Sequence, residues 1–141
     1  MHPKIVLDTN VFISSLRSRH GASFRLLSLI DSGRFTAGVS VPLVLEYEAA
    51  AKRQLKSIGL TATAVGDVID YICRVAEHHK VYYLWRPLLR DPKDDMVLEL
   101  AVSSGAEVIV TYNKADFRGA EQFGLKIQSP LQFLRYIGEL I

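Results

Sequence analysis

The chain has 141 residues, of which 49% are hydrophobic and 23% are charged, and its formal net charge is +2. Apolar residues are too plentiful and the net charge is too small for a disordered chain, so we expect a single soluble globular domain over residues 1–141. The apolar stretches are interrupted within about ten residues, whereas a membrane-spanning helix needs about 20. Residues 1–7 carry no signal-peptide pattern, and the single cysteine, Cys73, excludes a disulfide framework and a cysteine-based zinc site. A cytoplasmic protein with no membrane partner is the simplest expectation.

Short β-rich runs alternate with helical patterns along the chain. The predicted strands cover residues 4–7, 35–39, 81–85, 107–111 and 125–128. The predicted helices cover residues 24–30, 42–56, 62–79, 92–104 and a final stretch from residue 130. Strands separated by helices of this length favour right-handed crossovers between parallel strands. We therefore expect an α/β domain with a mostly parallel sheet of about five strands, helices on both faces, and ligands beyond the carboxyl ends of the strands.

Asp8 directly follows the first predicted strand. A carboxylate at that position points into the crevice at the end of a parallel sheet. Aspartate is also a favoured N-cap for the helix expected from about Val11 onward. Position alone leaves both roles open.

Glu46 lies in the helix predicted after the second strand. No basic residue stands three or four positions from it, whereas Glu48 has Lys52 at i+4. An acid without a local partner on a partly buried face is costly unless a group such as a metal ion compensates its charge. A half-exposed glutamate at the edge of the core is the alternative.

The densest acidic cluster is the segment DPKDD at residues 91–95. Asp91 suits an N-cap role, and Asp94 falls in the first helical turn, where an acid interacts favourably with the helix dipole. Neither capping nor the helix dipole requires an acidic residue at Asp95. We therefore assign Asp95 to the chemistry, with Asp94 as the second choice.

The fourth predicted strand is followed by Thr111, Asn113 and Asp116. Capping and turn roles account for Asn113 and Asp116 as well as a functional role does. Carboxylates gathered at the ends of neighbouring strands would repel one another and raise each other's pKa. A divalent cation resolves that conflict, and ligation by oxygen alone favours Mg²⁺ or Mn²⁺ over zinc.

In their order and spacing, these motifs resemble a PIN-domain ribonuclease over essentially the whole chain. The resemblance is carried by Asp8-Thr9-Asn10-Val11-Phe12, by Ser40 and Glu46, by Asp95 with Leu98 and Ala101, and by VTYNKADF at residues 110–117. The acidic segment at residues 91–95 is similar to that of a branch containing toxin components of toxin–antitoxin systems, related to the VapC toxins. The resemblance implies a three-layer, Rossmann-like α/β/α domain that cleaves single-stranded RNA with Mg²⁺ or Mn²⁺. It also implies an antitoxin partner, and pairing of subunits is common in the family, which makes a homodimer a further expectation.

The resemblance also implies roles for individual residues. Asp8, Glu46 and Asp95 take the places of the three main acids that hold the metal and activate water. Many family members have an aspartate where this chain has Asn113, so we expect Asp116 to be the fourth acid. The residues expected to support these acids by hydrogen bonding or as neighbouring polar groups are Thr9, Asn10, Thr111, Asn113 and Asp94.

Basic residues near these motifs form the predicted RNA-binding rim. They are Arg17, Arg19, Arg25, Lys114 and Arg118. If four acids are gathered in one site, the remaining surface is more basic than the net charge of +2 indicates. Such a surface suits a polyanionic substrate.

Two other enzyme classes fit the sequence poorly. A phosphatase of the haloacid dehalogenase type needs a second aspartate where this chain has Asn10, and a dinucleotide-binding domain needs a glycine-rich turn after the first strand. A PIN-like scaffold that binds RNA or a protein partner without cleaving remains the alternative, because Asn113 would weaken the metal site. Metal-dependent cleavage that is lost on Asp8→Asn discriminates between the two.

Overall fold

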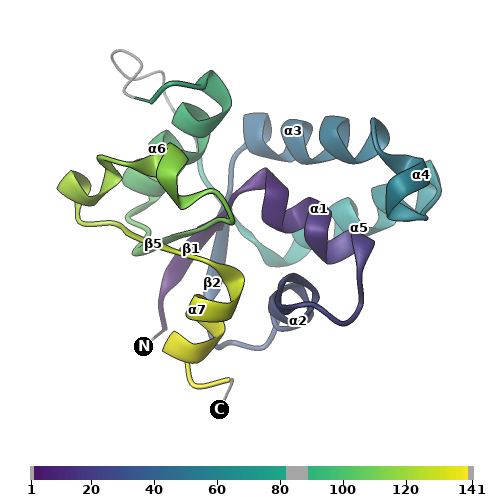
Figure 1. Ribbon diagram of the computed structural model, residues 1–141, viewed down its shortest axis with the longest axis horizontal. Helices are drawn as coiled ribbons and strands as arrows, with labels where there is room; N and C mark the ends of the chain where they lie inside the picture. Colours follow the sequence, from purple (N-terminus) through teal and green to yellow (C-terminus); the bar gives the residue numbers. More distant parts are fainter. Residues whose placement is uncertain (1, 82–88, 140–141) are drawn as a thin grey trace.

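The computed structural model describes residues 2–81 and 89–139. A five-stranded sheet with the order β3-β2-β1-β4-β5 forms its centre (Figure 1). The strands are β1 (Lys4–Leu7), β2 (Thr36–Val39), β3 (Glu77–His78), β4 (Val108–Val110) and β5 (Lys126–Gln128). Every pair of neighbouring strands is parallel. The predicted α/β fold with a parallel five-stranded sheet is confirmed.

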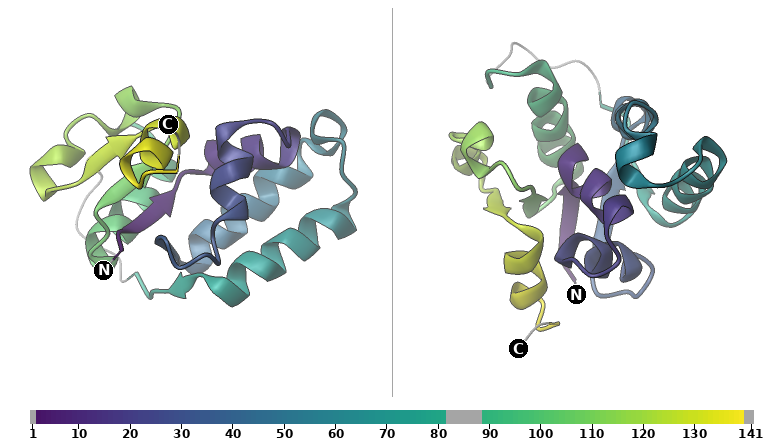
Figure 2. Two further views of the ribbon diagram at one scale, coloured as in Figure 1. Left: turned by 90° about the horizontal axis from the view of Figure 1, so that it is seen from below. Right: turned by 45° about the vertical axis from the view of Figure 1, so that its right-hand side comes forward.

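Helices connect the strands and cover the sheet. The α-helices are α1 (Thr9–Arg17), α2 (Ala22–Ser28), α3 (Val41–Lys52), α4 (Leu55–Ile58), α5 (Ala62–Val75), α6 (Pro92–Ser104) and α7 (Pro130–Tyr136). Two short 3₁₀ helices, η1 (Lys114–Phe117) and η2 (Ala120–Phe123), lie between β4 and β5. The connection from β1 to β2 moves toward one edge of the sheet, and the connection from β3 to β4 moves toward the other edge. Because both connections are right-handed, α1 and α2 lie on one face of the sheet and α6 lies on the other. Figure 2 shows this separation, with α6 packed on β1, β2 and β4 and with α7 beside α2.

The central strand β1 is buried along most of its length. Ile5, Val6 and Leu7 are each at most 5% exposed, as expected for a parallel strand covered on both faces. At the carboxyl end of β1 the chain turns at once into α1, and Asp8 is the N-cap of this helix. The carboxyl end of β2 leads into α3 in the same way, with the Ser40 side chain accepting a hydrogen bond from the Leu43 N–H.

The third strand and the helix before it differ from the prediction. Helix α5 ends at Val75 rather than at residue 79, because Ala76 adopts an extended conformation and the chain then pairs with β2. His78 belongs to β3, and the His79 N–H donates to the Val39 carbonyl. The strand predicted over residues 81–85 is therefore wrong in its described part: residue 81 lies in no strand, and residues 82–85 fall outside the described residues.

The other predicted elements agree within a few residues. The helix predicted over residues 42–56 ends at Lys52 and is followed by the separate short helix α4. The predicted helix over residues 92–104 matches α6 at both ends. In the part of the chain that is described, no helix has the length and apolar character needed to cross a membrane.

Candidate active site

Asp8 has the N-cap role that the sequence offered, and its carboxylate also reaches across to β4. Its Oδ1 atom accepts a hydrogen bond from the Thr9 N–H at 2.8 Å, which is the N-cap interaction of α1. Its Oδ2 atom accepts a hydrogen bond from the Thr111 hydroxyl at 2.7 Å, across from the end of β4. The residue is only 8% exposed. The carboxylate is thus fixed at the carboxyl edge of the sheet by β1 and β4 together.

Thr111 is the centre of a small network that holds this edge. Its Oγ1 atom accepts from the Asn113 N–H at 2.9 Å and from Asn10 Nδ2 at 3.4 Å. The Asn10 side chain in turn accepts from the Tyr112 N–H at 3.3 Å. The Thr9 N–H and the side chains of Asn10 and Thr111 therefore take part in hydrogen bonds at this edge, and their support of a metal site stays a prediction. Asn113 contributes its backbone N–H, while its side chain is exposed.

A cavity of about 510 Å³ lies between the start of α6 and η1. Its lining residues are Leu89, Arg90, Asp91, Asp94, Ala115, Asp116 and Arg118. Three of these seven residues are acidic, and they come from two segments that are more than twenty positions apart in the sequence. The cavity therefore unites the acidic segment before α6 with the acid that follows β4.

The acids at this cavity act on one another and on Asp8. Burial raises the pKa of Asp8, and the nearby carboxylates of Asp116 and Asp91 raise it further, against the hydrogen bonds from Thr111 and Thr9. Burial also raises the pKa of Asp94 to about 7, with added repulsion from the carboxylates of Asp8, Asp116, Asp91 and Asp95. We call Asp8, Asp91, Asp94 and Asp116 the acid cluster. Repulsion of this kind favours a nearby cation that compensates the negative charge.

Asp95 has a structural role that the sequence did not reveal. Its Oδ1 atom accepts a hydrogen bond from the Leu89 N–H at 2.9 Å, and the residue is 9% exposed. Asp95 therefore has a backbone partner besides the capping and dipole roles that the sequence analysis considered. The backbone segment that Asp95 holds precedes α6, and no helix-start pattern signals such a contact. The assignment of Asp95 to the chemistry stays a prediction.

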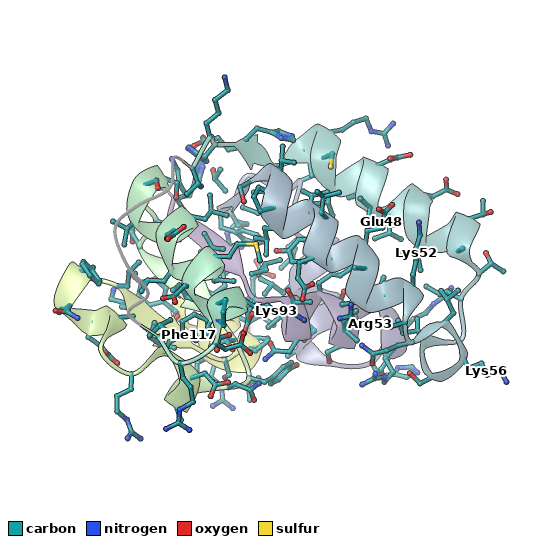
Figure 3. All side chains as sticks on the ribbon, turned by 90° about the horizontal axis from the view of Figure 1, so that it is seen from above. Glu48, Lys52, Arg53, Lys56, Lys93 and Phe117 are labelled. Carbon is teal, nitrogen blue, oxygen red and sulfur yellow. The ribbon has the colours of Figure 1, made fainter. Side chains whose placement is uncertain are left out.

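Glu46 has a partner from another element. Its Oε2 atom lies 3.4 Å from Lys93 Nζ, and its side chain is 13% exposed. Glu46 thus has a basic partner, which the search along its own helix did not find because Lys93 comes from the start of α6. Figure 3 shows Lys93 on the side of α6 that faces α3. Glu46 is not among the groups that shift the pKa of Asp8 or Asp94.

The predicted RNA-binding residues do not form one rim. Arg118 lines the cavity, together with Arg90, which the sequence analysis did not single out. Arg25 pairs with Glu139 near the end of α7. Lys114 donates a hydrogen bond to the neutral side chain of Gln132. Arg17 donates to the neutral side chains of Gln54 and Ser57. Arg19 is exposed.

The acids share an electrostatic field without forming a compact set of ligands. Within residues 2–81 and 89–139, no three histidine, cysteine, aspartate or glutamate side chains lie close enough together to hold one metal ion. The donors at the cavity are nevertheless carboxylate oxygens, which are the ligands that Mg²⁺ and Mn²⁺ prefer. Asp116 is exposed and Asp94 is half-buried, so both side chains have room to move toward Asp8.

Comparisons with known proteins agree with the fold. Residues 4–115 match the profile of the PIN domain, a stretch that contains every residue of the predicted site except Asp116 and Arg118. A chain in the crystal structure of VapBC2 from Rickettsia felis, bound to a DNA fragment from their promoter, has a similar fold with a TM-score of 0.61. The two chains are 14% identical, and the similarity covers 89% of this chain and 98% of that one. No curated protein matches the sequence. The predicted resemblance is confirmed: the chain belongs to the PIN-domain family.

Proposed function

We propose that this protein is an endoribonuclease that hydrolyses single-stranded RNA and depends on Mg²⁺ or Mn²⁺. Membership of the PIN-domain family supports a nuclease. The observation that carries the proposal is the acid cluster, in which burial and mutual repulsion raise the pKa of Asp8 and of Asp94. Such a cluster is costly in a metal-free protein and becomes favourable when a divalent cation compensates its charge.

The acids whose charges act most strongly on one another in this field are the best candidates to hold the metal. We assign Asp8, Asp94 and Asp116 to this role, with Glu46 as an additional ligand or base. Asp94 takes the place predicted for Asp95, because Asp94 lines the cavity whereas Asp95 accepts the Leu89 N–H. When bound, a divalent ion activates water and neutralises the charge that develops on the phosphate during hydrolysis.

The residues around the cluster prepare it for this task. The Thr111 hydroxyl and the Thr9 N–H hold the Asp8 carboxylate in one orientation, which lowers the reorganisation needed when a cation binds. Burial of Asp8 excludes water and strengthens its electrostatic interactions. Arg118 and Arg90 line the same cavity and place two guanidinium groups where a substrate phosphate would enter. Glu46 would have to exchange Lys93 for the metal or act from its present position.

We further propose that the protein is the toxin of a toxin–antitoxin pair. The similarity in fold to a chain of VapBC2 supports an antitoxin partner. A single domain, a homodimer and a cytoplasmic location remain expectations from the sequence. The alternative function is binding of RNA or of a protein partner without cleavage. In that case the same acid cluster would be present, but the protein would not hydrolyse RNA.

Incubation of the purified protein with a single-stranded RNA and Mg²⁺ or Mn²⁺ tests the proposal. We expect cleavage that stops when the metal is chelated and that is lost in Asp8→Asn. Asparagine is as good an N-cap as aspartate, so the substitution retains α1. Asp31→Asn, an exposed acid between α2 and β2, is the matched control and should cleave normally. Binding of RNA without metal-dependent cleavage would support the scaffold alternative instead.

A further inference from the structure

Several basic side chains continue from the acid cluster along one side of α3. Lys93 is at the start of α6 and contacts Glu46 on α3. Arg53 follows Glu46 by seven residues, which is two helical turns, so it lies on the same side of α3 about 10 Å further along. Lys56 comes next, in α4. Figure 3 shows Lys93 and Arg53 on one side of α3 and Lys56 beyond its end.

Arg17 joins this row from the end of α1. Its guanidinium donates to Gln54 Oε1 at 2.7 Å and to Ser57 Oγ at 3.4 Å; Gln54 is the N-cap of α4 and Ser57 lies within α4. Both acceptors are neutral, so the contacts fix the position of Arg17 without reducing its charge. We call Lys93, Arg53, Arg17 and Lys56 the basic strip.

Little negative charge offsets the strip. Within the described part of the chain, the Arg53 and Lys56 side chains make no hydrogen bond or ion pair, and both residues are exposed. The nearby acid Glu48 pairs with Lys52 at 3.4 Å, and Figure 3 shows this pair on the other side of α3, toward α5. Glu46 is the acid that contacts the strip, through Lys93. The strip therefore carries net positive charge from the site to the far end of α3.

We propose that a single strand of RNA runs from the acid cluster along the basic strip, with its phosphates in contact with Lys93, Arg53, Arg17 and Lys56. The inference rests on the proposed function and adds the direction in which the substrate leaves the site. A row of cations that follows an extended backbone suits a single strand. Contacts to phosphates carry no base recognition, so the strip binds RNA of different sequences with similar affinity.

The experiment measures RNA binding without cleavage. A fluorescently labelled single-stranded RNA of about twelve nucleotides, within the usual range of single-strand sites, is titrated with metal-free protein in chelator at several salt concentrations. The variants are Arg53→Ala/Lys56→Ala and the matched control Arg74→Ala/Arg135→Ala, which removes two exposed cations on α5 and α7. Far-ultraviolet circular dichroism verifies that both variants are folded.

We expect the strip variant to bind more weakly than wild type and to have a smaller salt dependence. Each phosphate contact contributes about 0.7 to the slope of log K against log salt for a single strand, so losing two contacts lowers the slope by about 1.4. The control variant should keep the wild-type slope. A strip variant whose slope and affinity equal those of the control would overturn the inference.

The outcome is separable from that of the proposed function. If the slope falls only in the strip variant while wild type cleaves no RNA in the presence of metal, the strip is supported and the nuclease proposal fails. If wild type cleaves RNA and the two variants bind alike, the nuclease proposal is supported and the strip is overturned.

Discussion

The two sides of the first turn of α6 give neighbouring aspartates different surroundings. Asp94 points toward the cavity, is half-buried, and has a pKa raised to about 7 by burial and by surrounding carboxylates. Asp95 is buried and accepts the Leu89 N–H, so it holds the segment that leads into the helix. Neighbouring residues on a helix are about 100° apart, and this rotation places Asp94 at the cavity and Asp95 against a backbone donor. Burial alone therefore does not distinguish the aspartate at the cavity from the aspartate that accepts a backbone hydrogen bond.

The largest expected effect separates these two aspartates by activity. Asp94→Asn should lower metal-dependent RNA cleavage by at least about a hundredfold, since loss of a ligand should exceed the 10–100-fold effect of residues that only support ligands. Asp95→Asn should have a small effect, because the amide oxygen still accepts the Leu89 N–H. Cleavage rates at saturating metal measure both. The reverse order would support the assignment of Asp95 that the sequence favoured.

A smaller effect should separate the two polar residues after β4. Asp116→Ala should reduce cleavage about tenfold, less than the loss of Asp94, because Asp116 interacts with Asp8 and Asp94 but is exposed to solvent and is therefore the weaker ligand. Asn113→Ala should reduce it less, since the Asn113 contact with Thr111 uses the backbone N–H, which alanine retains. Metal titrations of cleavage by each variant provide the measurement. A larger loss in Asn113→Ala would mean that its amide oxygen is the metal ligand.

The smallest expected effect is the pH dependence of stability in the metal-free protein. The Asp94 carboxyl has a pKa of about 7 when folded and an ordinary value of 3.8 when unfolded. Between these two pH values the folded state binds more protons at Asp94 than the unfolded state does. The contribution of Asp94 to the free energy of unfolding therefore falls as the pH rises and levels off above about pH 7. The raised pKa of Asp8 acts in the same direction.

Denaturant unfolding of wild type and Asp94→Asn, with chelator across this pH window, measures the effect. The variant should gain stability relative to wild type as the pH rises. A difference between the two proteins that does not change with pH would show that Asp94 is not in a repulsive field.

Much of the fold follows from the sequence, because the apolar strands and the helix caps are local signals. The run Ile5-Val6-Leu7 before Asp8 and the Asp91-Pro92 start of α6 lie where the sequence pattern placed them. The third strand was misplaced because its two residues, Glu77 and His78, are exposed and polar, and only their pairing with β2 makes them a strand.

The candidate site was predicted less completely, since its contacts join distant segments. The position of Asp8 after a strand predicted its place at the sheet edge. No local pattern predicted that Lys93 would pair with Glu46 or that Leu89 would donate to Asp95. Periodicity also could not decide which of Asp94 and Asp95 faces the cavity, because one wall of the cavity comes from η1, which is distant in sequence.

The central claim is that the acid cluster is a cation site, and thermal unfolding with and without Mn²⁺ tests it most directly. An ion that binds only the folded protein stabilises it by about 2.7 kcal/mol when its concentration is a hundred times its Kd. We predict that millimolar Mn²⁺ raises the Tm of wild type and that Asp8→Asn, which retains the helix cap, greatly reduces this rise. An equal rise in Tm for wild type and Asp8→Asn would contradict the account, because the cation would then bind elsewhere.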